Sequence, residues 1–246
     1  MTLRVLILGG TAEGRALADA CAGLPGISTV SSLAGRLRVP VPPAGEVRIG
    51  GFGGVDGLVA YLRAERIGAV VDATHPFAST ITASAVAASA ATGVPIVVLR
   101  RPGWTERPGD DWHRVATIVD AAALAPTLGR RIFLTTGRQT LAAFADSDAW
   151  FLARCVDPPQ PPLPGRLDVV LDRGPFTADG ELALLREHRI DVLVTKDSGG
   201  TMAAAKLEAA RTLGLPVVMV DAPLAVTAVE TVSSVGDALT WLTGRP

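Results

Sequence analysis

Cysteine and aromatic residues are scarce in this sequence, and each shortage excludes a class of protein. Only Cys21 and Cys155 are cysteines among the 246 residues, and they lie far apart without CxxC spacing. A disulfide framework and a zinc ribbon are therefore excluded, and we expect no metal site and a reducing, cytoplasmic location. With six Phe, four Trp and one Tyr, the core must come mainly from Ala, Val, Leu and Ile, which suits helices packed on a parallel sheet.

The sequence also lacks an excess of charge and a long hydrophobic run. The 23 Lys and Arg residues nearly balance the 24 Asp and Glu residues, for a net charge of −1, so nucleic acid is not expected as a partner. The Ala-rich stretch from Ile81 to Leu99 is interrupted by Gly93 and Pro95, which makes it a poor membrane span. The N-terminus runs from an apolar strand straight into a glycine turn, unlike a secretory signal. We therefore expect no membrane partner.

What the sequence does contain is a regular alternation of two kinds of segment. Hydrophobic residues make up 48% of the chain, which excludes disorder. Short Val/Ile/Leu runs alternate with Ala- and Leu-rich segments of helical period, a pattern typical of βαβ units that feed a parallel sheet. The segment 100–113 is rich in Pro, Gly and charge and is the best linker candidate. We expect an α/β fold in two halves, residues 1–103 and residues 104–246.

The expected elements follow from these runs. Strands are expected near Arg4–Leu8, Ser28–Ser31, Val47–Ile49, Ala69–Asp72, Ile96–Leu99, Arg131–Thr135, Ala149–Arg154, Val169–Asp172, Asp191–Thr195 and Val217–Val220. Helices are expected near Glu13–Cys21, Val55–Glu65, Ala78–Ala91, Gln139–Phe144, Asp179–Glu187, Met202–Leu213 and Val235–Leu242.

Four polar loops each follow an expected strand and precede an expected helix. Ligands of open α/β sheets bind outside the carboxyl ends of the strands, where such loops gather. Because both halves carry such loops, we expect a cleft between the halves. The loops are LGGTAEG (Leu8–Gly14), DATHPFA (Asp72–Ala78), TTGRQ (Thr135–Gln139) and TKDSGGT (Thr195–Thr201).

The first loop resembles a dinucleotide-binding turn. Small residues let the backbone approach a pyrophosphate, and the start of the following helix offers N–H donors and a favourable dipole. Thr11 stands where the G-x-G-x-x-G pattern has its second glycine, so a tight turn without ligand stays an alternative. The candidate cofactor-binding residues of this loop are Gly10, Thr11, Ala12, Glu13 and Gly14.

The segment after the second strand indicates which dinucleotide would bind. Residues 31–36 read SSLAGR and contain no carboxylate. A carboxylate there would select NAD, whereas Ser32 and Arg36 can accept a 2′-phosphate, so NADP(H) is favoured. A solvated surface charge is the alternative for Arg36, because Arg38 and Arg48 lie nearby. The run Gly50–Gly54, GGFGG, lets backbone or Phe52 lie against a flat ligand, or else forms a flexible loop.

The other three loops carry candidate ligand-binding and proton-transfer groups. We expect Thr74 or His75 to cap the helix that follows, with His75 contacting a ligand or transferring a proton; alternatively, these residues only cap and Asp72 fixes the turn. Thr136, Gly137 and Arg138 are expected to form an anion nest at a helix start, and Lys196–Thr201 repeats the arrangement. A Lys beside an Asp is more often an ion pair than a catalyst. Basic residues near these loops favour an anionic substrate.

Taken together, the motifs resemble those of the precorrin-6A reductases of cobalamin biosynthesis. The resemblance runs in order from the first strand to about Val220, and it departs at Asp197, where the family often has Asn. It implies two Rossmann-like domains and NADPH-dependent reduction of one macrocycle double bond, from precorrin-6A to precorrin-6B. The matching segments are GGTAEGRALA (Gly9–Ala18), SLAGR (Ser32–Arg36), GGFGG, DATHPFA, LTTGRQ (Leu134–Gln139) and TKDSGG (Thr195–Gly200).

The resemblance also assigns expected roles. His75 and Lys196 are the catalytic candidates, and which one delivers the proton is open. The cofactor-binding candidates are the residues of the first loop with Ser32, Arg36 and Thr74. An anionic tetrapyrrole would be bound by Thr136, Gly137, Arg138, Ser198, Gly199 and Gly200. Transient contacts with neighbouring enzymes of the pathway are expected as well.

Several alternatives compete with this interpretation. A short-chain dehydrogenase is excluded, because the only tyrosine, Tyr61, is followed four residues later by Glu65 and not by Lys. A cobalt-precorrin-6A reductase, a non-catalytic tetrapyrrole- or nucleotide-binding module, and a tetrapyrrole enzyme without a nucleotide, similar to uroporphyrinogen synthase, stay open.

Overall fold

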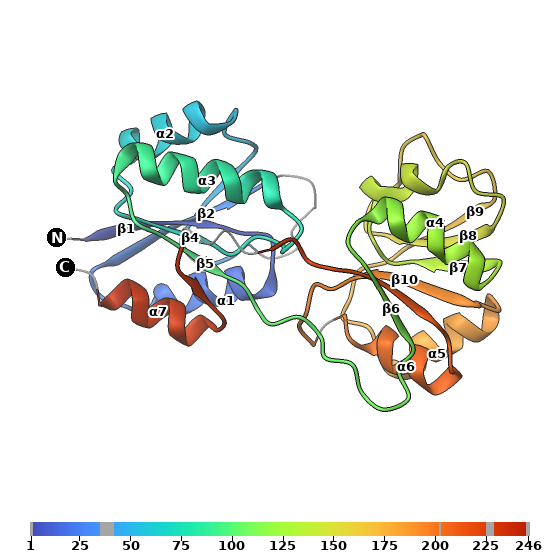
Figure 1. The fold of residues 1–246 in the computed structure, drawn as a ribbon. Coiled ribbons are helices and arrows are strands. Elements are labelled where there is room, and N and C mark those ends of the chain that lie inside the picture. The colour runs from blue at the N-terminus through green and yellow to red at the C-terminus, as the bar shows by residue number, and fades with distance from the viewer. Residues whose placement is uncertain (1, 35–41, 202, 225–228, 245–246) are drawn as a thin grey trace. The chain divides into compact units, whose positions relative to one another are not determined.

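The chain folds into two compact α/β units. The structure is a computed structural model that describes residues 2–34, 42–201, 203–224 and 229–244. The first unit comprises Met1–Arg101 with Pro223–Pro246, and the second comprises Pro102–Ala222. Each contains one six-stranded parallel sheet (Figure 1). In the described part of the chain, no helix is long and apolar enough to cross a membrane.

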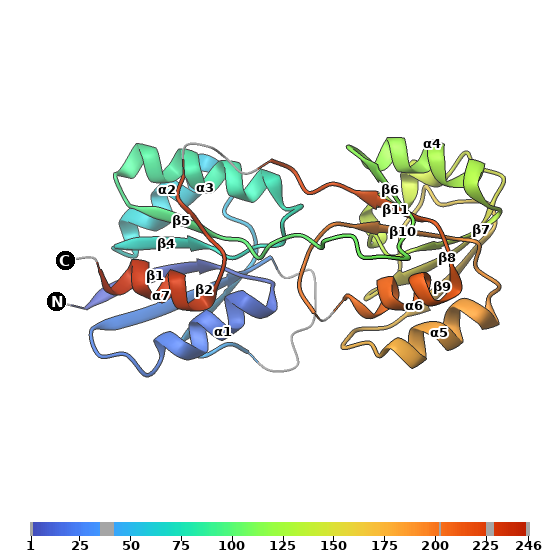
Figure 2. The ribbon, with the colours of Figure 1, turned by 60° about the horizontal axis from the view of Figure 1, so that its bottom comes forward.

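The first unit has helices on both faces of its sheet. The order of its strands is β12-β5-β4-β1-β2-β3. Helices α2 and α3 cover one face, and α1 and α7 cover the other (Figure 2). The strands are β1 (Leu3–Leu8), β2 (Ile27–Leu33), β3 (Glu46–Ile49), β4 (Ala69–Asp72), β5 (Ile96–Leu99) and β12 (Thr231–Val232). The helices are α1 (Ala12–Cys21), α2 (Val55–Ala64), α3 (Ser79–Thr92) and α7 (Val235–Thr243).

The alternation of side chains along β1 explains this layering. Val5 and Ile7 pack with Leu17 of α1 and Leu242 of α7 in one buried cluster. Their neighbours Leu6 and Leu8 face the opposite way, into a cluster with residues of α2 and α3. Because both faces of a central parallel strand are buried, Val5–Leu8 of β1 is a continuous apolar run rather than an alternating one.

The second unit repeats the plan with other elements. Its strand order is β6-β11-β10-β7-β8-β9. Phe133 of β7 and Leu193 of β10 pack on Leu185 of α5 and Leu207 of α6. The strands are β6 (Trp112–Val115), β7 (Arg131–Leu134), β8 (Trp150–Cys155), β9 (Leu167–Leu171), β10 (Val192–Lys196) and β11 (Val217–Val220). The helices are α4 (Ile118–Leu128), the 3₁₀ helix η1 (Arg138–Phe144), α5 (Ala178–Glu187) and α6 (Ala205–Leu213).

Both sheets have the Rossmann strand order, but each takes its outermost strand from a distant part of the chain. Read from β3 and from β9, the orders correspond to 3-2-1-4-5-6. In the first sheet the sixth position is filled by β12, which pairs in parallel with β5 and follows the whole second unit in sequence. In the second sheet the sixth position is filled by β6, which precedes all the other strands of that sheet and pairs with β11.

This topology differs from the expected domain limits. The expected division after residue 103 lies close to the observed division after Arg101. The expected second half, however, extended to residue 246, whereas Pro223–Pro246 belongs to the first unit. The physical reason is that β12 pairs with β5 and that Ala238 and Leu242 of α7 pack on the core around β1. The cleft expected between the halves stays a prediction, since each unit is described by itself.

One glycine supports a tight turn at the start of α2, and its replacement is expected to destabilise the fold. A Cβ atom on Gly57 would overlap the carbonyl oxygen of Phe52, a backbone atom that cannot rotate away. We expect Gly57→Ala to lower the free energy of unfolding by about 3 kcal/mol, measured by urea denaturation. The matched control is Gly51→Ala, because a Cβ there meets no atom within 4 Å. Equal losses in both variants would contradict the prediction.

Candidate functional site

The four polar loops lie where the strand order of each sheet reverses. In the first sheet this point is between β1 and β4, where Leu8 pairs with Asp72. In the second sheet it is between β7 and β10, where Leu134 pairs with Val194. Ligands of doubly wound sheets bind at such a switch point. The prediction that the loops follow strands is therefore confirmed, and the loops form two pairs, one in each unit.

The turn after β1 has the geometry of a dinucleotide-binding turn. Gly10 has a φ of +119°, and a Cβ on it would meet no atom within 4 Å, so the backbone is open to a ligand. Gly14 packs α1 tightly on the β4 loop, since a Cβ there would lie 3.2 Å from the Cβ of Ala73. The N–H groups of Ala12 and Glu13, in the first turn of α1, have no acceptor within the helix. These features fit a bound pyrophosphate.

Thr11 connects this turn to the neighbouring loop. Its hydroxyl accepts a hydrogen bond from the Gly14 N–H (3.1 Å) and donates one to the carbonyl oxygen of Ala73 (2.7 Å). Thr11 is thus the N-cap of α1, and its side chain is occupied by the protein. Thr11 can therefore make its predicted cofactor contact only through its backbone.

Glu13 forms an ion pair at the same helix start. Its Oε2 atom lies 2.6 Å from Nη1 of Arg101, and both side chains are largely buried. The helix dipole favours the Glu13 carboxylate in the first turn of α1, and Arg101 neutralises its charge.

The loop after β4 is fixed by a buried carboxylate. Asp72 is 1% exposed and accepts hydrogen bonds from the Thr74 N–H (3.0 Å), the Thr74 hydroxyl (2.6 Å) and the Thr82 hydroxyl (2.5 Å). The alternative that Asp72 fixes the turn is therefore confirmed.

The prediction that Thr74 or His75 caps the following helix is wrong. Helix α3 begins at Ser79, and its N-cap, Ala78, makes no side-chain cap. Thr74 is turned back to Asp72, and the Ala78 N–H donates to the carbonyl of His75 (2.7 Å), so these residues form a turn ahead of the helix. His75 is exposed, and its Nδ1 accepts from the Phe77 N–H at 3.3 Å, which leaves Nε2 to carry the proton of the neutral ring.

The end of β2 brings together two residues that are far apart in sequence. Ser32 is buried and lies directly opposite Arg48 of β3, whose Nη1 is 3.3 Å from the Ser32 hydroxyl. Arg36 lies outside the described residues. In the sequence Arg48 is only a charge near Arg36, and its place beside Ser32 emerges from the strand pairing.

The loop after β7 differs from the expected anion nest. The segment Arg138–Phe144 is a 3₁₀ helix, and Gly137, with a φ of +86°, provides no side-chain cap. Thr136 is buried, and its hydroxyl accepts from the Thr140 hydroxyl at 2.8 Å. Arg138 lies 3.5 Å from Asp157. The loop therefore offers a guanidinium and backbone groups, but not the start of an α-helix.

The loop after β10 ends later than expected. The predicted helix began at Met202, whereas α6 begins at Ala205, so Ser198–Thr201 do not form a helix start. The backbone of Gly199 and Gly200 is left-handed, with φ of +63° and +78°. A Cβ at such positions would be strained, which explains the glycine pair. The prediction that this loop repeats a helix-start nest is wrong.

Lys196 and Asp197 have separate environments within that loop. Lys196 ends β10, and burial lowers the pKa of its ammonium group. Asp197 is 6% exposed and pairs with Arg114 at 2.6 Å, while its other oxygen accepts from the Trp104 N–H at 2.9 Å. A lysine whose charge is destabilised by burial releases a proton more readily than an exposed one.

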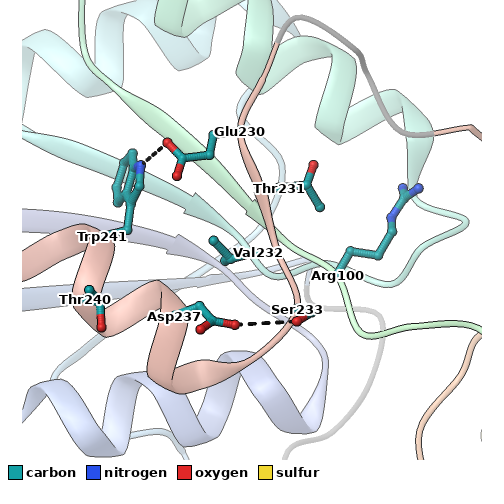
Figure 3. Close-up of a pocket in the computed structure, with 8 residues that line it drawn as sticks. All are labelled: Arg100, Glu230, Thr231, Val232, Ser233, Asp237, Thr240 and Trp241. Atoms are coloured by element: carbon teal, nitrogen blue, oxygen red, sulfur yellow. Dashed lines mark hydrogen bonds between the residues drawn. The ribbon is translucent and has the colours of Figure 1, made fainter.

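One cavity lies beside β12 and α7 and not at these loops. Its volume is about 490 Å³, and it is lined by Arg100, Glu230 and Trp241 among others. In Figure 3, Glu230 accepts a hydrogen bond from the indole of Trp241. We assign the chemistry to the switch-point loops instead, because this cavity contains none of the predicted residues. In the described parts of the chain, no group of His, Cys, Asp and Glu side chains is arranged to hold a metal ion.

Comparisons with known proteins agree with this geometry. A family model described as precorrin-6x reductase CbiJ/CobK matches residues 4–243. A precorrin-6A reductase of Rhodococcus erythropolis is 57% identical over 240 residues, which cover 97% of each chain. A cobalt-precorrin-6A reductase of Priestia megaterium is 31% identical over 234 residues, which cover 89% of this chain and 90% of the other. A solved structure of CobK precorrin-6A reductase superposes with a TM-score of 0.91 at 45% identity, covering 99% of this chain and 97% of that chain.

Proposed function

The chain belongs to the precorrin-6x reductase family, and on that premise we propose that it reduces precorrin-6A to precorrin-6B in cobalamin biosynthesis with NADPH. The observation that supports this proposal most strongly is the switch point of the first sheet. There an open glycine turn and the start of α1 lie beside the end of β2, which has no carboxylate. The buried free thiols of Cys21 and Cys155 suit the cytoplasmic location that we propose.

The residues of the first unit fit NADPH. Gly10 leaves room for a pyrophosphate, and the N–H groups of Ala12 and Glu13 are aimed along the axis of α1. Arg101 pairs with Glu13 there, so the Glu13 carboxylate adds no net negative charge beside a pyrophosphate. At the β2 end, Ser32 offers a hydroxyl and no carboxylate repels a phosphate. Arg36 and Thr74 complete the proposed cofactor site.

In the proposed mechanism the protein orients the cofactor and the substrate, neutralises the substrate carboxylates and protonates a ring carbon. When bound, NADPH supplies the hydride that the conjugated ring accepts. Lys196 holds a proton on Nζ and gives it to the neighbouring ring carbon, with exposed His75 as the second candidate. Acetate and propionate groups of the substrate are bound by a guanidinium and by small, glycine-rich loops, an arrangement that suits carboxylates. The residues proposed for this are Arg138, Thr136, Gly137, Ser198, Gly199 and Gly200.

The metal-free ring is the better supported substrate. The relative named precorrin-6A reductase is 57% identical to this chain, against 31% for the relative named cobalt-precorrin-6A reductase. We therefore propose precorrin-6A over its cobalt complex. Parallel assays on both rings test this choice.

Titration and turnover with both nicotinamide dinucleotides test the proposed function. We expect tight binding of NADPH, weaker binding of NADH, and consumption of NADPH only when precorrin-6A is added. A non-catalytic binding module would bind these ligands and never consume NADPH. Absence of turnover with both the metal-free and the cobalt-containing ring would refute the reductase assignment.

A further inference from the structure

We propose that Arg48 binds the 2′-phosphate of the cofactor and sets the preference for NADPH over NADH. This inference rests on the proposed function and adds a residue that the sequence pattern does not assign to the cofactor. It also gives a structural reason for the glycine run 50–54.

The position of Arg48 is that of the ribose-reading site. In Rossmann sheets, the residues at the carboxyl end of the second strand read the ribose hydroxyl or its phosphate. Ser32 occupies this end of β2, and Arg48 is its partner in β3. The sequence contains no Asp or Glu between Asp19 and Glu46, nor between Glu46 and Asp56. Glu46, two residues before Arg48, has both carboxylate oxygens bound by Arg4, so the charge of Arg48 favours a phosphate over a free hydroxyl.

The guanidinium of Arg48 is held in place before any ligand binds. Its Nη1 donates to the carbonyl of Gly50 and its Nη2 to the carbonyl of Gly51, both at 2.6 Å. Its Cζ atom lies 3.9 Å from the ring centroid of Phe52, a cation–π contact. Fixing the group in this way removes part of the entropy cost of binding.

The remaining donors of Arg48 suit a phosphate. The edge formed by Nη1 and Nη2 is directed to the two glycine carbonyls, and Nη1 also reaches Ser32. In the described structure this leaves the edge formed by Nε and the second hydrogen of Nη2, a parallel pair of N–H groups. Two such groups match two oxygens of one phosphate, which a lysine cannot reproduce.

The glycine run positions these carbonyls. Gly50 has a φ of +114°, a conformation that L side chains rarely adopt. It turns the chain at the end of β3 so that the carbonyls of Gly50 and Gly51 return to Arg48 of the same strand end. The first two glycines of the run therefore hold the arginine in place.

Binding measurements on Arg48 variants test the proposal. We expect Arg48→Gln and Arg48→Lys to weaken binding of NADPH and of 2′,5′-ADP by about 10- to 100-fold, the range of hydrogen bonds to charged groups. Binding of NADH and of 5′-AMP should change by less than about threefold, because the lost bonds involve only the 2′-phosphate. The control is Arg63→Gln in α2, which removes the same charge from an exposed site in the same unit and should preserve the selectivity.

The ratio of the dissociation constants of NADPH and NADH shows whether Arg48 recognises the 2′-phosphate or only supports the structure. A purely structural arginine would weaken NADPH and NADH equally, and that result would overturn the proposal. Unchanged NADPH selectivity in Arg48→Gln would overturn it too, and would point to Arg36. Because 2′,5′-ADP binding is measured without precorrin-6A, failure of turnover would count against the proposed reaction and not against Arg48.

Discussion

Lys196→Met is expected to slow single-turnover oxidation of NADPH by precorrin-6A about 10²- to 10⁴-fold, the usual contribution of a positioned general acid. Methionine keeps an unbranched apolar stem and removes the ammonium group. Burial already disfavours that charge, as the lowered pKa of Lys196 shows, so the variant should unfold at no lower denaturant concentration than the wild type. A loss of rate without a loss of stability identifies a chemical role.

The pH dependence of the rate gives an independent test of Lys196. A proton donor must be protonated, so the rate should fall as pH rises through the pKa of Lys196. Because burial lowers this pKa from 10.5, the decline should occur at lower pH than for an exposed lysine. Lys196→Arg should be slow at every pH, since a guanidinium does not release its proton in this range.

His75→Ala is the matched comparison, because His75 is the other candidate donor and is exposed. We expect its effect on the rate of the chemical step to be smaller than that of Lys196→Met. An unchanged rate in Lys196→Met, with a large loss of rate in His75→Ala, would identify His75 as the proton donor. Unchanged rates in both would make water the donor.

Glu181→Ala is expected to destabilise the second unit by about 3–5 kcal/mol, the cost of leaving a buried charge without its partner. Glu181 of α5 and Arg154 of β8 form a bidentate pair, with N–O distances of 2.6 and 2.9 Å. Their side chains are 2% and 7% exposed. The guanidinium also lies 3.9 Å from the ring centroid of Phe176, so an aromatic ring encloses it on that side.

Two further variants separate the contribution of the ion pair to stability from the effect of its burial. The double variant Arg154→Met, Glu181→Leu should regain most of the lost stability, because apolar residues of similar volume often replace a buried ion pair at little cost. Asp148→Ala breaks the solvent-exposed pair between Arg130 and Asp148 and should leave the urea midpoint unchanged. A loss in Glu181→Ala no larger than in Asp148→Ala would contradict the prediction.

Local sequence patterns were sufficient to predict most of the fold and the four loops. The strands Ala69–Asp72, Ile96–Leu99 and Val217–Val220 have the expected limits, because Gly or Pro directly precedes each apolar run. The expected elements did not include helix α4, nor β6 and β12, which are short and amphipathic or polar. Nor could it place α7 in the first unit, since strand pairing between distant segments leaves no local signal.

The site shows the same division between local and distant information. The turn at Gly10 and Gly14 was predictable, because each glycine meets a local steric requirement. The pairing of Arg48 with Ser32 depends on strand register, and the pairing of Asp197 with Arg114 joins residues 83 positions apart. Two expected helices differ for a third reason. The helix expected over Gln139–Phe144 is a 3₁₀ helix over Arg138–Phe144. The helix expected from Met202 begins only at Ala205, because Gly199 and Gly200 with positive φ extend the loop before it.

Transfer of isotope from cofactor to product tests the reductase assignment most directly. The enzyme should be incubated with precorrin-6A and NADPH carrying deuterium at C4 of the nicotinamide, in separate reactions for the two faces, and the product analysed by mass spectrometry. We predict that one face delivers one non-exchangeable deuterium to each product molecule, with one NADPH consumed. Product formed without deuterium from either face, or NADPH consumed without reduced product, would contradict hydride transfer from NADPH to the macrocycle.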